Sequence, residues 1–174
     1  MQRVMIIGSP GSGKSTLARE LHALTGLPLI HLDQTYFGHN WAIPETAVWE
    51  ERVRGLIARD RWVMDGNYGG THEMRFARAD TVILLDLPTH VCLRRVIWRS
   101  IRSYGKQRSD MAEGCREKID FSFLHYVLIF RKTRAGKLLR RMKDLKSEKE
   151  VHILRNKTQI REFLVNVKAG GQTS

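Results

Sequence analysis

The residues with the clearest chemical potential form one short stretch near the amino terminus, Gly8-Ser9-Pro10-Gly11-Ser12-Gly13-Lys14-Ser15-Thr16. The stretch satisfies the pattern G-x-x-x-x-G-K-[ST], which is typical of loops that bind phosphate groups. Glycines permit positive φ and let main-chain N–H groups approach an anion. The lysine reaches the β- and γ-phosphates, and the hydroxyl after it is a Mg²⁺ ligand. We therefore expect a nucleoside triphosphate and Mg²⁺ to be bound by Gly8, Ser9, Gly11, Ser12, Gly13, Lys14, Ser15 and Thr16.

The segments around this stretch have the required pattern. The apolar run 4–7 before it predicts a buried strand. Leucines at 17, 21 and 24 have helical spacing, so a helix follows from about residue 16. The amino end of that helix would add partial positive charge beside the bound phosphates.

Three aspartates come at the ends of apolar runs: Asp33, Asp65 and Asp86. In a parallel sheet, ligands lie beyond the carboxyl ends of the strands, which is where these three carboxylates would fall. We favour Asp65 as the partner of Ser15 at the metal, because Gly66-Asn67 leaves its strand end open. Asp86 is followed by Leu87-Pro88 and is better explained as a helix cap or a structural acid.

Asp33 has two interpretations that the residues alone leave open. A hydroxyl acceptor gains from a carboxylate that takes its proton, whereas a phosphate acceptor needs no base at neutral pH. Asp33 therefore indicates a hydroxyl acceptor. A role in orienting the metal ligands or in capping a helix is the alternative.

Composition places the chain among globular proteins. Its 174 residues are 42% hydrophobic and 28% charged, and the mean hydropathy is −0.35. No apolar run approaches the roughly 18 residues that a membrane span needs, and we find no signal-peptide core. Two cysteines without a C-x-x-C spacing indicate free thiols in a reducing compartment. We expect a cytoplasmic protein.

Hydrophobic periodicity predicts strands that alternate with helices, and hence an α/β fold with a parallel sheet covered on both faces. Strands are expected at 4–7, 27–32, 62–65, 81–87 and 151–154. Helices are expected at 16–24, 45–58, 71–78, 89–103, 121–145 (with a break near 135–136) and 157–167. We expect one domain over residues 1–167, with an acceptor-side insert at about 34–60, a basic lid at about 104–120, and a disordered tail at 168–174.

The order of these motifs resembles the adenylate-kinase-like nucleoside monophosphate kinases. Over nearly its full length the chain looks closest to a branch called the DNA topology modulation (FlaR-related) proteins. The resemblance is carried by His31-Leu32-Asp33, Trp62-Val63-Met64-Asp65-Gly66-Asn67-Tyr68, Arg75, Leu85-Asp86-Leu87-Pro88, Cys92-Leu93-Arg94-Arg95, Arg108-Ser109-Asp110 and Cys115-Arg116-Glu117-Lys118-Ile119-Asp120.

This resemblance implies a three-layer P-loop fold with strand order 2-3-1-4-5, and ATP and Mg²⁺ as cofactors. It places Asp65 at the metal, Arg95 and Arg99 on adenine and phosphates, and Arg108 in the lid. It also implies that Arg155-Asn156-Lys157 lies against adenine.

The acceptor side departs from adenylate kinases, because Gly66-Asn67-Tyr68-Gly69-Gly70-Thr71 contains no arginine and the first one is Arg75. We expect the acceptor to meet Asp33, Tyr36, Trp41, Asn67 and Arg75, with Lys14, Asp33, Arg95, Arg99 and Arg108 in catalytic roles.

The charge is unevenly distributed, and it supports a second interpretation. Residues 1–90 carry nine Lys/Arg and ten Asp/Glu, a net −1, while residues 91–174 carry twenty-one and eight, a net +13. The main prediction is an ATP-dependent kinase that acts on a nucleotide, a nucleoside or a small hydroxyl compound. The alternative is a nucleic-acid-associated protein that affects DNA topology and uses the nucleotide site for regulation. A switch GTPase is disfavoured because the guanine signature Asn-Lys-x-Asp is missing.

Overall fold

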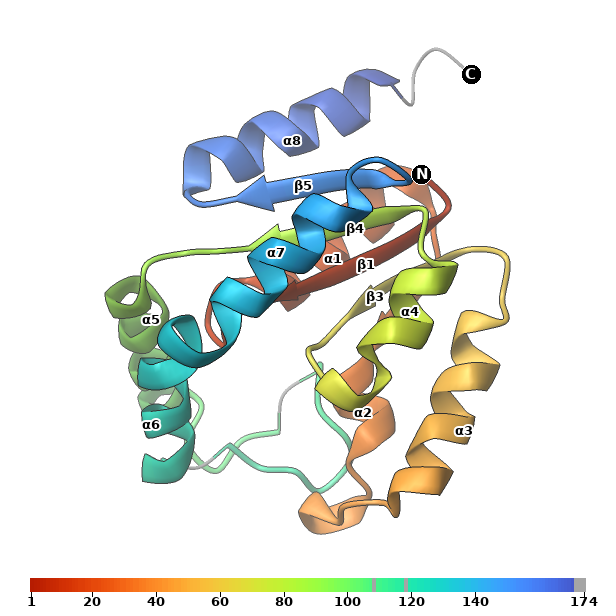
Figure 1. The fold of residues 1–174 in the computed structure, drawn as a ribbon. Helices are drawn as coiled ribbons and strands as arrows, with labels where there is room; N and C mark the ends of the chain where they lie inside the picture. Colours follow the sequence, from red (N-terminus) through yellow and green to blue (C-terminus); the bar gives the residue numbers. More distant parts are fainter. Residues whose placement is uncertain (108, 118, 171–174) are drawn as a thin grey trace.

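The computed structural model describes residues 1–107, 109–117 and 119–170. Five parallel strands form one sheet in the order β2-β3-β1-β4-β5 (Figure 1). The predicted α/β class and strand order are therefore confirmed. The strands are β1 (Arg3–Gly8), β2 (Leu29–His31), β3 (Trp62–Asp65), β4 (Thr81–Leu85) and β5 (Glu150–Leu154).

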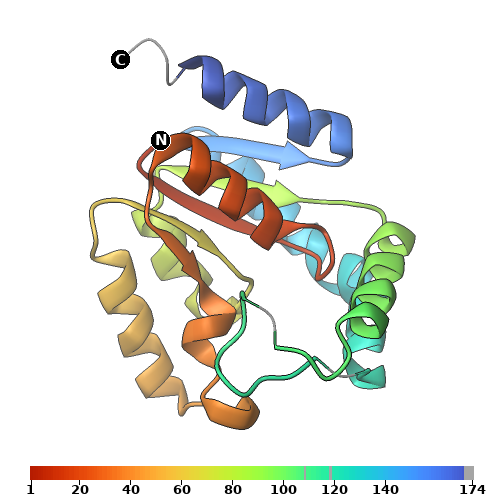
Figure 2. The ribbon, with the colours of Figure 1, turned by 180° about the vertical axis from the view of Figure 1, so that it is seen from behind.

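Helices cover both faces of the sheet and make three layers, as the two opposite views show (Figures 1 and 2). The α-helices are α1 (Lys14–Thr25), α2 (Leu32–Tyr36), α3 (Thr46–Ile57), α4 (His72–Arg78), α5 (Thr89–Arg102), α6 (Phe121–Phe130), α7 (Gly136–Leu145) and α8 (Lys157–Gly170). Two 3₁₀ turns, η1 (His39–Trp41) and η2 (Gly69–Thr71), and a π-helical turn, η3 (Arg131–Ala135), complete the described elements.

Each face of the sheet has its own core because successive side chains of a strand point to opposite faces. Met5 and Ile7 of β1 pack with α3, α4 and α7 on one face. Val4 and Ile6 pack with α1, α5 and α8 on the other. The side chains that β1 buries on the two faces, Val4 to Ile7, are all apolar, which matches the continuous hydrophobic run in the sequence.

Several element boundaries differ from the sequence-based predictions; for example, the second strand begins at Leu29 and not at 27, and the fourth ends at Leu85 and not at 87. The second strand ends at His31, so Asp33 lies in the first turn of α2 and not at the end of a strand. The helix predicted across 121–145 runs through a π-helical turn at 131–135, where a break near 135–136 was expected. The last helix continues to Gly170, beyond the predicted end at 167, while residues 171–174 lie outside the described ranges.

The segment after α5 crosses from that helix toward η1 and α2 (Figure 2). It is joined to α5 by Glu117, which accepts from Ser100 Oγ at 2.9 Å and pairs with Arg99 Nε at 3.3 Å. It reaches the other side through the Gln34 amide, which donates to the carbonyl of Ser109, and through a 3.6 Å contact of Cys115 Sγ with Gly38 O. Within the described ranges, no helix has both the length and the apolar content that a membrane crossing requires.

Candidate active site

The glycine-rich stretch forms a loop between β1 and α1. Gly11 has φ 77°, and a Cβ there would lie 2.5 Å from the carbonyl oxygen of Cys92 in α5. The loop can therefore pack under α5 only with glycine at this position. Gly13 precedes α1 in a left-handed conformation, and no side chain in the described part of the chain caps that helix end. The loop thus presents main-chain donors at an uncapped helix amino terminus, an arrangement that suits phosphate.

Lys14 is the first residue of α1, and its side chain folds back onto this loop. Its Nζ donates to the carbonyls of Gly8 at 3.1 Å and Ser9 at 3.0 Å. Burial lowers the pKa of the Lys14 ammonium, while the negative charges of Asp33 and Asp65 act against that shift. The lysine is therefore within electrostatic reach of both carboxylates that the sequence suggested for chemistry.

A short hydrogen-bond chain holds the carboxylate of Asp65. Ser15 Oγ donates to Asp65 Oδ2 at 2.7 Å, and His31 Nδ1 lies 2.5 Å from Asp65 Oδ1. His31 is 8% exposed and Asp65 5% exposed, so both oxygens of the carboxylate are held in a buried environment. The predicted pair of Ser15 and Asp65 is brought together, and His31 is an unpredicted third member.

The residues of this site fit ATP with Mg²⁺. Ser12 Oγ is buried and has no hydrogen-bond partner among the residues that the structure describes, which leaves a hydroxyl free for a phosphate oxygen. The hydroxyl of Ser15 and the carboxylate of Asp65 are the hard oxygen ligands that Mg²⁺ prefers. Among the described residues, no group of three or more His, Cys, Asp or Glu side chains is placed to hold a metal ion.

The residues predicted to contact an acceptor include Asp33, which lies beside a group of aromatic rings. Tyr68 donates its hydroxyl to Asp33 Oδ1 at 2.6 Å. The Tyr68 ring lies 4.5 Å from that of Tyr36 and 4.9 Å from that of Trp49, between ring centroids. Trp41 joins this group through Phe37, whose ring centroid is 5.0 Å away. The predicted residues Asp33, Tyr36 and Trp41 therefore lie on one side of the site.

The side chains of Asn67 and Arg75 form hydrogen bonds with main-chain groups of this region. Asn67 Oδ1 accepts from the N–H of Gly8, which links the loop after β3 to the phosphate-binding loop at 3.1 Å. Arg75 has no exposed surface, and its guanidinium donates to the carbonyls of Gly66, Asn67 and Tyr68. This arrangement argues against the predicted contact of Arg75 with an acceptor, because its donors are used by the protein itself.

One of the three predicted arginines contacts the phosphate-binding loop. Arg95 Nη1 donates to the carbonyls of Ser12 at 3.1 Å and Gly11 at 3.4 Å. Arg99 pairs with Glu117, and its charge contributes to lowering the pKa of Lys14. Arg95 therefore lies against the loop that is expected to bind phosphates, and the charge of Arg99 acts on the Lys14 ammonium. Arg108 falls outside the described residues.

The residues expected near adenine follow β5. Arg155 Nε lies 3.5 Å from Asp86 Oδ2, and Arg131 Nε lies 3.3 Å from the other oxygen of the same carboxylate. Asn156 Oδ1 accepts from the N–H of Gln159 in the first turn of α8, as a helix-capping side chain does. Lys157 begins α8 and is exposed. Asp86, at the end of β4, is thus a structural acid that neutralises two arginines.

Sequence reasoning missed three residues of the site: His31, Tyr68 and Glu117. For His31 the available signal was a histidine at the end of an apolar run; Glu117 gave no such signal, because its 6% exposure is a property of the fold. Tyr68 had no such signal, because a tyrosine in a glycine-rich loop is ordinarily exposed.

Two pockets lie outside the phosphate-binding loop. One of about 480 Å³ opens between the insert and the segment after α5, and it is lined by His39, Asn40, Trp41, Tyr104, Gly105, Gly114, Arg116 and Glu117. Its position beside Trp41 is compatible with the predicted acceptor side.

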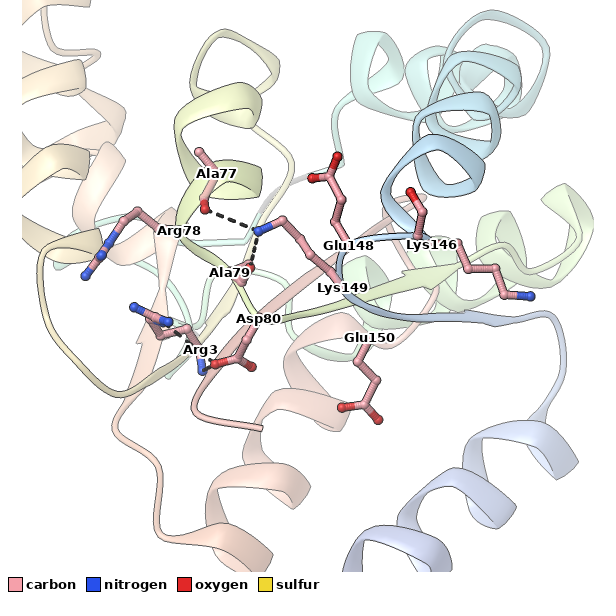
Figure 3. Close-up of a pocket in the computed structure, with 10 residues that line it drawn as sticks. Arg3, Ala77, Arg78, Ala79, Asp80, Lys146, Glu148, Lys149 and Glu150 are labelled. Carbon is pink, nitrogen blue, oxygen red and sulfur yellow. Dashed lines mark hydrogen bonds and ion pairs between the residues drawn. The ribbon is translucent and has the colours of Figure 1, made fainter.

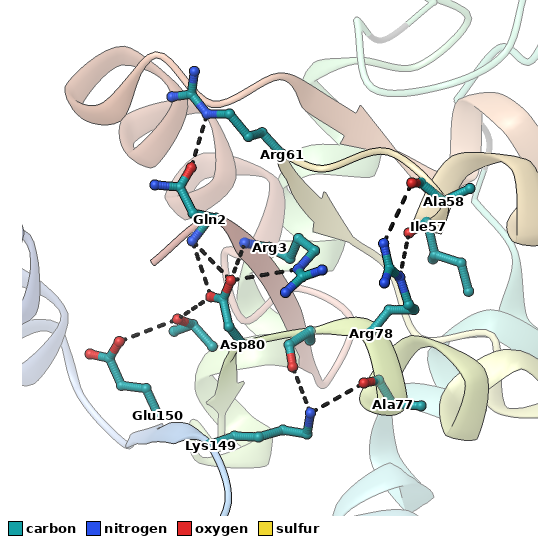
Figure 4. A network of polar contacts seen from close by, with 12 residues as sticks. Gln2, Arg3, Ile57, Ala58, Arg61, Ala77, Arg78, Asp80, Lys149 and Glu150 are labelled. Carbon is teal, nitrogen blue, oxygen red and sulfur yellow. Dashed lines mark hydrogen bonds and ion pairs between the residues drawn. The ribbon is translucent and has the colours of Figure 1, made fainter.

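The second pocket, of about 500 Å³, lies at the amino ends of β1, β4 and β5 (Figure 3). Lys149 Nζ there donates to the carbonyls of Ala77 and Ala79. Asp80 accepts from the backbone N–H groups of Gln2 and Arg3 in the same network (Figure 4). These contacts join strand ends opposite the edge where ligands of such sheets bind, so we assign the network to stability.

Comparisons with known proteins agree with this architecture at the level of the fold. No family model matches the chain. A LexA repressor from Albidiferax ferrireducens is 24% identical to this chain over 119 residues. The match covers 45% of that curated relative, so the chain spans about half of its length.

Two solved shikimate kinases superpose on nearly the whole chain. The enzyme from Bacteroides thetaiotaomicron aligns with a TM-score of 0.59 and 16% identity, covering 98% of each chain. The enzyme from Acinetobacter baumannii in complex with shikimate aligns with a TM-score of 0.58 and 17% identity, covering 96% of this chain and 90% of that one. The chain therefore has the P-loop kinase-like fold that these two enzymes share.

Proposed function

We propose that the protein is an ATP-dependent kinase that transfers the γ-phosphate of ATP to a hydroxyl group of a small molecule. The observation that carries this proposal is that Lys14 Nζ is held by the carbonyls of Gly8 and Ser9, that Asp65 accepts from the neighbouring Ser15, and that the charges of Asp33 and Asp65 both act on the Lys14 ammonium. One carboxylate suits the metal and the other suits the acceptor, as phosphoryl transfer between ATP and a hydroxyl requires.

Each side chain has a definite task in this proposal. Ser15 and Asp65 would hold Mg²⁺, which neutralises charge on the phosphates. Lys14, Arg95 and Arg99 would stabilise the transferring group, with Arg108 of the predicted lid as an additional cation. Asp33 would take the proton of the acceptor hydroxyl as that oxygen bonds to the γ-phosphorus and the bond to the ADP oxygen breaks. The predicted lid at 104–120 would exclude water and so favour transfer over hydrolysis.

The remaining parts of the nucleotide and acceptor sites follow from the same arrangement. Residues 155–157 would lie against adenine, with Arg155 held by Asp86. Tyr36 and Trp41 would contact the acceptor beside Asp33, and the aromatic surface suits a molecule with an apolar face. Nucleosides, nucleotides and sugar-like compounds all remain in the acceptor class. Free thiols at Cys92 and Cys115 suit a reducing cytoplasm.

The test is an acceptor screen that follows ADP release with ATP and Mg²⁺ over nucleotides, nucleosides, sugars and hydroxy acids. We expect one class to stimulate ADP release and Lys14→Ala to abolish the stimulation. Asp33→Asn should lower acceptor-dependent transfer by about 10²-fold or more while ATP still binds. The proposal would be contradicted if the protein is folded and binds ATP but no acceptor stimulates ADP release.

The charge distribution supports a second candidate, a nucleic-acid-associated protein. The net +13 of residues 91–174 is the observation in its favour, and the resemblance to DNA topology modulation proteins points the same way. Binding through phosphate contacts loses affinity steeply as salt rises, whereas turnover of a small acceptor has little such dependence. ADP release that is stimulated by DNA and by none of the small acceptors would favour this candidate.

A further inference from the structure

The loop that follows β3 has a strained conformation that many contacts maintain. Tyr68 has φ 42° and ψ 71°, a left-handed conformation that is rare for a residue with a bulky side chain. Such conformations persist only where the surrounding structure holds them, and they concentrate at functional sites. The contacts that hold Tyr68 therefore indicate what the conformation is for.

The backbone of the loop is held from one side by Arg75. This fully buried guanidinium donates to the three successive carbonyls of Gly66, Asn67 and Tyr68. The Tyr68 carbonyl also accepts from the N–H and the hydroxyl of Thr71, each at 3.0 Å. Burial lowers the pKa of Arg75 to about 9, so its guanidinium is still charged at neutral pH and its hydrogen bonds are charge-assisted.

From the other side the loop is pressed against the helix that carries Asp33. Gly66 has φ 137°, and a Cβ there would lie 2.8 Å from Cβ of Leu32. The ring of Tyr68 packs between Tyr36 and Trp49, and its hydroxyl donates to Asp33 Oδ1. Loop 66–68 and α2 are thus a closely fitted pair, with one hydrogen bond directed at the carboxylate.

The same loop also touches the phosphate-binding loop. Asn67 Oδ1 accepts from the N–H of Gly8, and Gly66 follows directly after Asp65. Residues 66–68 therefore connect Asp65, the proposed metal ligand, with Asp33. The carbonyls of all three residues accept hydrogen bonds from Arg75. A rigid support of this kind is what a catalytic carboxylate needs to keep its orientation.

We propose that Tyr68 is a positioning residue that holds the carboxylate of Asp33 toward the acceptor hydroxyl, and that Arg75 fixes loop 66–68 for this purpose. The inference rests on the proposed function in assigning Asp33 to the acceptor. It gives Arg75 a role in positioning rather than in substrate contact, and it assigns a function to a tyrosine that the sequence pattern did not indicate.

Burial of Tyr68 and the neighbouring charge of Asp33 support this geometry, since both raise the pKa of the Tyr68 phenol above its ordinary value. The phenol stays protonated at any working pH and remains a donor to Asp33. An ionised tyrosine would have to face a carboxylate at hydrogen-bond distance, which both burial and like charge oppose.

The experiment is a double-mutant cycle on Tyr68→Phe and Asp33→Asn, read out as acceptor-dependent transfer and as ATP affinity. Tyr68→Phe keeps the ring in the aromatic group and removes only the hydroxyl. We expect it to lower transfer by at least about tenfold while ATP affinity stays unchanged. In the Asp33→Asn background the same change should have no further effect, because Tyr68 acts through Asp33. Equal losses in both backgrounds, or full activity of Tyr68→Phe, would overturn the proposal.

Arg75→Lys supplies a second, independent measurement. Lysine keeps the charge but cannot donate to three carbonyls in the same fork. We expect faster hydrogen exchange of the backbone amides over residues 66–71 and a loss of transfer like that of Tyr68→Phe, with exchange in β1 and β4 unchanged. Exchange at 66–71 equal to that of the parent would contradict the role of Arg75.

The proposal can also be separated from the proposed function. If no acceptor stimulates the parent protein, the kinase proposal fails, and the contact is then tested by urea unfolding of a double-mutant cycle on Tyr68→Phe and Asp33→Ala, because alanine leaves the Tyr68 hydroxyl without its acceptor. Non-additive destabilisation in this cycle would support the hydrogen bond between Tyr68 and Asp33. Additive effects would overturn it.

Discussion

Ser15 Oγ donates a 2.7 Å hydrogen bond to Asp65 Oδ2, which joins the end of the phosphate-binding loop to the end of β3, 50 residues further along the chain. A hydroxyl and a carboxylate at this distance can share one hard cation with little movement. The contact is the structural basis for placing Mg²⁺, and the first prediction tests it.

Removal of either oxygen ligand should weaken the metal site selectively. We expect Ser15→Ala and Asp65→Asn each to raise the Mg²⁺ concentration needed for half-maximal activity by about tenfold or more. Mn²⁺ binding in the presence of ATP, followed by electron paramagnetic resonance, should weaken in parallel. Thr25→Val, which removes a hydroxyl from the far end of α1, is the matched control. Unchanged Mn²⁺ affinity in both site variants would exclude this pair as the metal ligands.

His31 should act on the same cation indirectly. Because its Nδ1 holds Asp65 Oδ1, His31→Phe should free that carboxylate and weaken Mn²⁺·ATP binding by about tenfold. His31→Asn retains a side-chain donor near the same place and should recover part of the loss. Equal losses in the two variants would indicate that His31 matters only for packing in β2.

Lys14 should be indispensable for binding the triphosphate. Its ammonium would exchange the carbonyls of Gly8 and Ser9 for β- and γ-phosphate oxygens. Lys14→Ala should reduce transfer by roughly 10³-fold and should weaken ATP more than AMP in calorimetry. Lys137→Ala, which removes an exposed lysine of α7, serves as the control. Equal ATP affinity of the parent and Lys14→Ala would contradict the nucleotide site itself.

Glu117 should control how the lid and Arg99 are held. It pairs with Arg99, accepts from Ser100, and its backbone bonds to the start of the lid segment. Glu117→Ala should lower transfer and raise the ratio of ATP hydrolysis to transfer, because a looser lid admits water. The measurement is ADP release compared with phosphorylated acceptor. A ratio equal to that of the parent would argue against a water-excluding lid.

Asp80 should contribute stability that depends on pH. Burial alone would raise its pKa, but hydrogen bonds from Gln2, Thr81 and Arg3 outweigh burial and hold the pKa of Asp80 below its ordinary value. Its contribution is therefore complete above the unfolded pKa, at about pH 4, and is lost as the pH falls through the lower folded-state pKa.

Urea unfolding at neutral and acid pH provides the measurement for Asp80. Asp80→Ala should cost about 1 kcal/mol at neutral pH, and the difference from the parent should shrink below pH 4 or so. Exposed Asp60 offers the matched control, Asp60→Ala. A difference that is constant with pH would show that the charge of Asp80 is not what stabilises this end of the sheet.

The sequence by itself determined the sheet and the phosphate-binding loop, because both depend on local patterns. Apolar runs of strand length, helical spacing of leucines and the G-x-x-x-x-G-K-[ST] pattern are all encoded within short windows. Asp65 ends β3, the neighbour of β1, and Ser15 follows the loop after β1, so the sequence places both at the same edge of the sheet, where Ser15 Oγ donates to Asp65 Oδ2.

Only the tertiary structure decided what surrounds these groups. His31 and Tyr68 meet the carboxylates of Asp65 and Asp33 across 34 and 35 residues of chain, and no local pattern specifies such partners. Arg75 was expected to reach an acceptor, yet the fold buries it, and a buried guanidinium must satisfy its donors with the carbonyls that it meets. Burial and hydrogen-bond satisfaction are properties of the packed molecule, so they fix roles that residue type and spacing leave open.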